Sequence, residues 1–418
     1  MARIDRLSRN TLILLANNVI TAVLAFVVTI LISRGLGDAA FGHYATVMAW
    51  VLPLSIGADF GVATLVTRNV ASRPSAAHAY LRRALRVRWL VGGGIVVGVL
   101  VLAPWLSQSP TVVMGLRIAI LLSLVDALFG TYTAIFRAWE VMWPILLLNT
   151  LFFGLQIAGI GIILWQEGDI LLVLAAIVSA DIIQLLGTWG LWRLHLRHRY
   201  SEATAVIDVQ HVVRKAWPFA VAGVLAILQV RAIVILLDRY LPAEAVGWYA
   251  AAARLVEAAR LAPSALFVAL FPQLAALASE PARFVRLFRW SAWGLSLYAA
   301  GFALVCLLAG RPVVYLLFGA QFEDAISVLV LLSWSLLPGV LRALMTLRLY
   351  AMRRESRVNW MLASAVLVQL GAGAILIPVY GPEGAAAAVI ASEILLLIGL
   401  WASARRLMPR FVQNASSC

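Results

Sequence analysis

Four arginines inside long apolar runs are the residues with the clearest chemical potential: Arg231, Arg254, Arg260 and Arg342. An arginine at the centre of a membrane helix costs at least about 2.5–3.5 kcal/mol, so each must face protein or water. The guanidinium group stays charged when buried and donates paired hydrogen bonds to phosphate or carboxylate oxygens. With a rise of about 1.5 Å per residue, the four lie at different depths. They predict a binding surface for an anionic molecule that enters the membrane.

The alternative for each arginine is an ion pair that only holds helices together. Glu257 stands three residues from both Arg254 and Arg260, so helical spacing lets it neutralise one of them. Other acids also lie within apolar runs, namely Asp59, Asp126, Asp181 and Glu393. The sequence leaves cargo binding and structural pairing both open.

Further candidate residues are polar groups in the N-terminal half. Asp59 follows Pro53 and lies between Gly57 and Gly61, which weaken a helix near the middle of the membrane. Asn17 and Asn18 form a polar patch that either contacts cargo or holds helices together. We therefore add Asp59, Asn17 and Asn18 to the candidate substrate-binding residues. The candidates for ion coupling are Asp59, Asp126 and Glu257.

Motifs of soluble enzymes do not occur in the sequence. It lacks the Walker A and GxGxxG phosphate loops, so this chain does not drive transport by ATP hydrolysis. His195 and His198 are too weak a pair to predict a metal site. We predict no catalytic residue, no metal and no cofactor, and hence a protein that is not an enzyme.

The composition is that of a membrane protein: 63% of the residues are hydrophobic and only 12% are charged. About twelve apolar runs are long enough to cross a bilayer. The net charge of +14 does not indicate nucleic-acid binding, because the basic residues punctuate the apolar runs. The predicted spans cover 11–33, 43–66, 89–106, 112–136, 144–165, 170–192, 218–237, 245–272, 290–309, 325–350, 359–379 and 385–404.

Basic residues in the connecting segments set the orientation. Nearly all fall on the side of the two termini, against Arg34, Arg239 and Arg311 on the other, so both termini should be cytoplasmic. The basic segments 78–88 and 282–289 should lie on the membrane surface with their arginines toward lipid headgroups. Eight tryptophans at span ends should form an interfacial belt: Trp89, Trp105, Trp143, Trp165, Trp192, Trp217, Trp248 and Trp290.

The chain contains an internal repeat. The stretch from Arg34 to Tyr44 returns as Arg239 to Tyr249, with four identities 205 residues apart. The pair Glu167-Gly168 likewise returns as Glu383-Gly384. We predict an all-α polytopic protein built from two parallel six-helix lobes, at 1–200 and 218–418, joined by a cytoplasmic linker at 201–217.

Short motifs along nearly the whole chain resemble Wzx-type polysaccharide flippases, lipid-linked oligosaccharide flippases of the multidrug/oligosaccharidyl-lipid/polysaccharide (MOP) exporter superfamily. In the N-terminal half they are Asn17-Asn18, Ser33-Arg34-Gly35-Leu36-Gly37, Phe41-Gly42-His43-Tyr44, Asp59-Phe60-Gly61 and Thr67-Arg68-Asn69-Val70-Ala71. In the C-terminal half they are Phe318-Gly319, Asn359 and the stretch from Pro378 to Ala385.

This resemblance implies a fold like that of MATE transporters and MurJ, with a cationic central cavity that works by alternating access. The cargo would be undecaprenyl-diphosphate-linked oligosaccharide, moved from the cytoplasmic to the periplasmic leaflet for surface polysaccharide such as lipopolysaccharide. It implies a bacterial inner-membrane protein that contacts membrane lipids. A polysaccharide polymerase is an expected partner, and the protein is expected to be a monomer.

Two other functions stay open. An ion-coupled multidrug antiporter of the same superfamily is one, although a basic cavity disfavours cationic cargo. A membrane glycosyltransferase or polymerase is the other, although the sequence has no large external loop to carry catalytic acids. The coupling ion, whether proton, Na⁺ or none, is also open.

The charge asymmetry yields a topology prediction. Reporter fusions after residues 200 and 418 should report the cytoplasm, and a fusion after residue 167 should report the periplasm. A periplasmic C-terminus would contradict an even number of spans.

Overall fold

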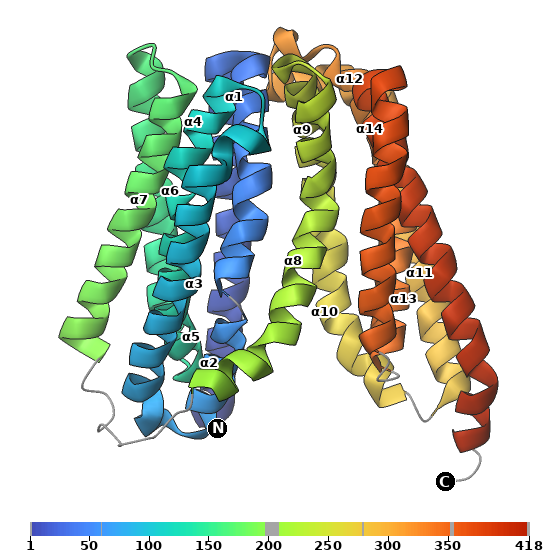
Figure 1. Ribbon diagram of the computed structural model, residues 1–418. Helices are drawn as coiled ribbons and strands as arrows, with labels where there is room; N and C mark the ends of the chain where they lie inside the picture. The colour runs from blue at the N-terminus through green and yellow to red at the C-terminus, as the bar shows by residue number, and fades with distance from the viewer. Residues whose placement is uncertain (1, 60, 197–208, 278–279, 352–354, 416–418) are drawn as a thin grey trace. The chain divides into compact units, whose positions relative to one another are not determined.

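The computed structural model describes residues 2–59, 61–196, 209–277, 280–351 and 355–415, which form helices joined by short turns (Figure 1). Within these ranges there is no strand, as the all-α prediction requires. Contacts divide the chain into two compact units, Met1–Ile227 and Leu228–Cys418. The predicted linker falls partly outside the described residues, and its end, 209–217, is helical. The predicted lobe boundaries at 200 and 218 stay a prediction.

The elements of each unit follow in chain order. The first unit contains α1 (Ala2–Asp59), α2 (Val62–Ser72), α3 (Ala77–Leu106), α4 (Pro110–Ala119), α5 (Leu121–Ala138), α6 (Trp143–Trp165) and α7 (Ile170–Leu191). Helix α8 (Val209–Tyr240) contains the boundary between the units. The second unit continues with α9 (Ala243–Ala259), α10 (Leu261–Ala276), α11 (Pro281–Leu317), α12 (Ala325–Ser333), α13 (Leu336–Ala351) and α14 (Glu355–Ala415).

Among the described residues, eight helical segments are long and apolar enough to cross a membrane. Two of them, with 61 and 44 residues, are far longer than the roughly 20 residues that one crossing needs. A glycine with positive φ interrupts each long helix, Gly37 in α1 (φ 89°) and Gly381 in α14 (φ 60°). Each helix therefore forms two arms that run in opposite directions (Figure 1). Helix α8 and the α9–α10 segment cover two further predicted spans. The described helices therefore account for about twelve crossings.

Both copies of the repeated motif lie at turns between helices. In the first unit the turn is at Gly37 within α1. In the second unit α8 ends at Tyr240, and Pro242, the residue 205 positions after Gly37, directly precedes α9. The same agreement holds for Glu167, between α6 and α7, and Glu383, just after the turn at Gly381. Equivalence of the two complete units stays a prediction.

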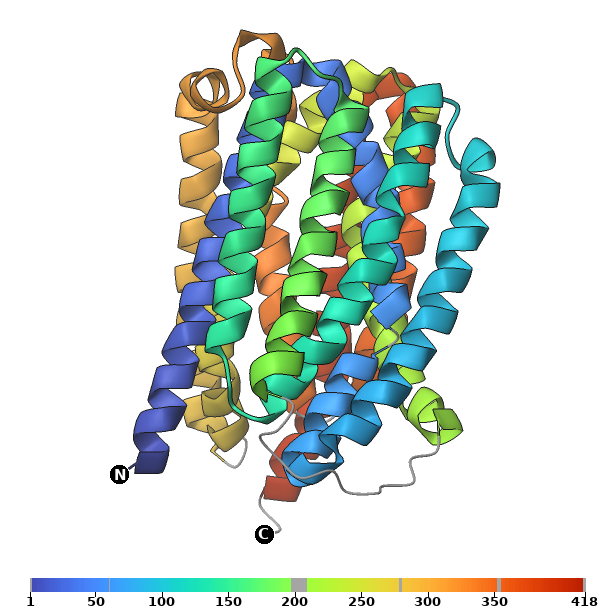
Figure 2. The same ribbon diagram turned by 90° about the vertical axis from the view of Figure 1, so that its left-hand side faces the viewer.

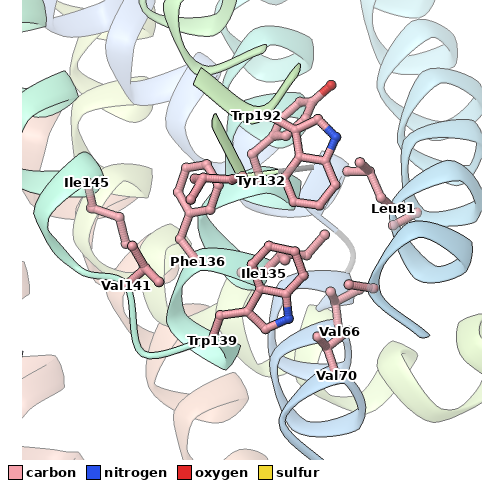
Figure 3. Close-up of a cluster of buried hydrophobic side chains, with 14 of the residues drawn as sticks. Val66, Val70, Leu81, Tyr132, Ile135, Phe136, Trp139, Val141, Ile145 and Trp192 are labelled. Atoms are coloured by element: carbon pink, nitrogen blue, oxygen red, sulfur yellow. The ribbon is translucent and has the colours of Figure 1, made fainter. Parts of the chain in front are cut away.

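The helices of the first unit run along its length side by side, with α6 packed against both α1 and α7 (Figure 2). A hydrophobic cluster at the end of this unit joins α2, α3 and α5 (Figure 3). Within it Trp192 stacks on Trp139 with ring centroids 5.3 Å apart, and Tyr132 meets the Trp192 ring edge-on.

The interfacial position predicted for Trp192 is therefore wrong, because a π-helical turn (Trp192–Leu196) follows α7 and the ring is only 6% exposed. Five other tryptophans of the predicted belt are strongly exposed, as a lipid interface requires: Trp89, Trp105, Trp143, Trp165 and Trp290.

Truncating Trp192 should destabilise the first unit. Trp192→Ala removes a buried indole and should cost about 3–5 kcal/mol of unfolding free energy. Trp165→Ala is the matched control, because the Trp165 side chain is 85% exposed. Thermal unfolding in one detergent should show a lower midpoint for Trp192→Ala alone. Equal shifts in both variants would contradict the buried position.

Candidate functional site

Glu257 holds two of the predicted arginines in the second unit. Its Oε1 lies 3.1 Å from Nη1 of Arg231 on α8, and its Oε2 lies 3.0 Å from Nη1 of Arg254. Arg254 and Glu257 are three residues apart on α9 and therefore share one helix face. One carboxylate thus bridges two guanidinium groups and ties α8 to α9.

Glu393 on α14 does the same for the other two predicted arginines. Its Oε2 lies 2.5 Å from Nε of Arg342 on α13, and its Oε1 lies 3.7 Å from Nη2 of Arg260. The Glu393 side chain is only 5% exposed. Arg260 occupies the break between α9 and α10, where the helix stops and restarts. Neither of these partners is close to Glu393 in the sequence.

All four predicted arginines therefore have an acidic partner. Four guanidinium groups share two carboxylates, so the cluster has two more positive charges than negative ones. Because each carboxylate is shared by two guanidinium groups, the pairing does not neutralise the cluster. These ion pairs agree with the alternative in which the arginines hold helices together. Contact of the arginines with cargo stays a prediction.

A pocket of about 60 Å³ lies beside this cluster, within the second unit. Its charged lining residues are Glu257, Arg260, Arg342 and Glu393. The pocket gives the charged cluster room for a bound group.

In the first unit the candidate Asp59 has a buried partner that the sequence analysis missed. Arg88 on α3 has no solvent-exposed surface and donates to Asp59, to Thr131 Oγ1 and to the carbonyl oxygen of Ala127. The surface position predicted for Arg88 is therefore wrong. The signal was present in the periodicity, since Arg88 follows Leu81 by seven residues and Ala84 by four, and both are buried.

Asn17 belongs to a chain of amides that connects three helices. Asn149 on α6 donates to Asn17 Oδ1 over 2.9 Å, and Gln184 on α7 donates to Asn149 Oδ1 over 2.9 Å. This arrangement fits the helix-holding alternative for Asn17. Asn18 is exposed. Contact of either residue with cargo stays a prediction.

Two acids of the first unit lie on helices that pack against each other. Asp126 is on α5, and Asp181 is buried on α7. In the part of the chain that the structure describes, no three or more His, Cys, Asp or Glu side chains gather as a metal site would require. Ion coupling through Asp59, Asp126 or Glu257 stays a prediction.

Removing Arg88 should destabilise the protein by leaving Asp59 without its cation. We expect Arg88→Met to cost about 3–5 kcal/mol, the usual penalty for breaking a buried pair. Adding Asp59→Asn should recover part of this loss, because the orphaned charge is then gone. Abundance in the membrane and the unfolding midpoint measure both steps. Additive losses in the double variant would mean that the two side chains do not interact.

Comparison with known proteins identifies the family and the fold of this chain. Residues 7–278 match the model of a family described as "Polysaccharide biosynthesis protein". A search of curated proteins found no match.

Solved structures of transporters share the fold. An inward-facing multidrug resistance MATE family transporter of the MOP superfamily aligns with a TM-score of 0.80 at 14% identity, over 94% of this chain and 96% of that chain. Lipid II flippase MurJ in an inward closed conformation aligns with a TM-score of 0.75 at 13% identity, over 96% and 90%. A MOP superfamily transporter from Pyrococcus furiosus, described as having a binding pocket of reverse polarity, aligns at 0.64 and 16% identity, over 97% and 95%. The chain therefore belongs to the polysaccharide biosynthesis protein family and is a polytopic membrane protein with the fold of MOP transporters and flippases.

Proposed function

We propose that this protein is a flippase for oligosaccharide linked to a lipid diphosphate of the undecaprenyl type. It moves this lipid from the cytoplasmic to the periplasmic leaflet by alternating access during surface polysaccharide biosynthesis. The observation that carries the proposal is the charge cluster of the second unit, where four arginines share Glu257 and Glu393 within membrane-spanning helices. Family membership and the likeness to a lipid II flippase support it.

The diphosphate explains why an excess of arginine is useful. A doubly charged group cannot cross hydrocarbon without compensation, and guanidinium groups provide donors that stay charged whatever their burial. The carboxylates of Glu257 and Glu393 keep the arginines paired while no cargo is bound. A phosphate that displaces a carboxylate replaces one anion by another, so no guanidinium loses its partner at any step.

The same proposal gives the protein a place in the cell. It lies in the bacterial inner membrane with both termini in the cytoplasm, in contact with membrane lipids. It acts as a monomer beside a polysaccharide polymerase that consumes the translocated lipid. The energy for transport comes from an ion gradient or from that consumption.

Multidrug export is the second candidate, because a multidrug MATE transporter aligns over nearly the whole chain. The charges oppose it, since cationic drugs would be repelled by a cluster with more arginines than glutamates. A drug antiporter would lower the susceptibility of a drug-sensitive host. A flippase would instead restore glycan display in a strain that lacks its own polysaccharide flippase.

The arginine cluster can be tested without confusing folding with transport. Arg342→Ala combined with Glu393→Gln removes one cation and the charge that it would orphan. The amide oxygen of the new glutamine can still accept a hydrogen bond from Arg260, so we expect near-normal abundance in the membrane. Glycan display should fall by at least about tenfold, because the diphosphate loses a charged donor pair. Display per molecule of membrane protein is the measurement.

The matched control is Arg311→Ala combined with Glu323→Gln, an ion pair whose two side chains are 70% and 58% exposed. Display should stay normal in this control. Normal display in the Arg342 and Glu393 double variant would rule out a role for this arginine in moving cargo.

A further inference from the structure

Two neutral polar groups in the pocket of the second unit have no hydrogen-bond partner among the described residues. They are Nε2 of Gln229 on α8 and Oγ of Ser335, and both residues line the pocket. Gln229 is 8% exposed and Ser335 is fully buried. A buried polar group without a partner destabilises a fold, and nearly all such groups in native proteins are satisfied. These two groups therefore point to a ligand in the pocket.

The backbone around the pocket is built for a ligand as well. Ser335 stands in the break between α12 and α13, and Arg260 stands in the break between α9 and α10. Interrupted helices at membrane depth are tolerated where they line a cavity. Gln369 on α14 adds a second buried amide to the lining, next to Ser392, whose hydroxyl donates to its Oε1.

The character of the lining indicates what binds. The charged residues that line the pocket are two arginines and two glutamates, and Arg231 and Arg254 are not among them. A diphosphate only accepts hydrogen bonds, so it can use the arginines of the lining but not its carboxylates, which have no proton to donate. A sugar hydroxyl both donates and accepts, and can use the amides, the serine and the carboxylates together.

We propose that this pocket binds a neutral sugar unit of the lipid-linked oligosaccharide, and that Gln229 and Ser335 form hydrogen bonds with its hydroxyl groups. This rests on the proposed flippase function and deepens it. The diphosphate is then bound by the arginines of the cluster, and the neutral groups of the pocket are left to the sugar. A site that hydrogen-bonds a hydroxyl strongly discriminates against an analogue that lacks it, so these two residues set the glycan preference.

Binding to the purified full-length protein tests the proposal. The probes are glucose, galactose and N-acetylglucosamine, detected by saturation-transfer NMR, and inorganic pyrophosphate, detected by phosphorus line broadening. At least one sugar should bind the wild type, and pyrophosphate should not displace it. Gln229→Leu and Ser335→Ala should each weaken that sugar about tenfold, the loss expected for one hydrogen bond to a hydroxyl.

The matched control is Ser333→Ala. Ser333 is fully buried two positions away, but its hydroxyl donates to the carbonyl oxygen of Val330 and it does not line the pocket. Sugar binding should be unchanged in this control. The unfolding midpoint of Ser335→Ala should be unchanged or raised, because the substitution removes a buried hydroxyl that has no protein partner. A lowered midpoint would assign that hydroxyl a structural role and overturn the proposal.

Two other results would overturn it. One is the absence of binding by every sugar probe, and the other is pyrophosphate binding that Gln229→Leu abolishes, which would make the pocket a phosphate site. Glycan display in cells separates this proposal from the flippase function. Normal display after deletion of the gene contradicts the flippase, whereas display that depends on the gene but not on Gln229 contradicts only the sugar pocket.

Discussion

A charge inside a membrane helix must have a partner, and this constraint accounts for the ion pairs that join helices within each unit. Arg88 pairs with Asp59 and so ties α3 to α1. Glu257 ties α8 to α9, and Glu393 ties α14 to α13 and to the end of α9. Each carboxylate is satisfied by residues from another helix, so the helices cannot separate without exposing a charge to hydrocarbon.

The two units meet this constraint differently, although their repeated motifs indicate a common origin. In the first unit one arginine faces one aspartate, and neutral amides from Asn17 to Gln184 join further helices. In the second unit four arginines share two carboxylates, so the cluster has an excess of positive charge. The residues 205 positions before Arg254, Glu257 and Arg260 are Ala49, Leu52 and Ser55. The repeated motif therefore shares the turn and not the charges, and the four arginines lie in the second unit alone.

The shared fold by itself does not decide the cargo. Multidrug transporters and a lipid II flippase align with this chain at 13–14% identity, so their architecture serves different substrates. The feature of this chain that bears on its cargo is the local chemistry of the second unit: paired arginines beside a pocket with neutral hydrogen-bonding groups. The family model, which names polysaccharide biosynthesis, agrees with that chemistry.

The sequence by itself determined the membrane-spanning architecture. Hydropathy and helix length are local properties, so the predicted spans agree with the helices, and the repeated motifs marked the turns at Gly37 and Pro242. It also identified the four arginines and Glu393 as intramembrane charges, because their cost depends only on the apolar run around them.

Only the tertiary structure decided which charges meet. Nothing in the local sequence joins Arg342 to Glu393, 51 residues later, or brings Arg260 to the same carboxylate. Gln229 and Ser335 could not be singled out either, because an ordinary glutamine and serine become informative only when packing buries them without a partner. Pairing and burial depend on how helices from distant parts of the chain pack against each other, and that packing is a property of the folded unit as a whole.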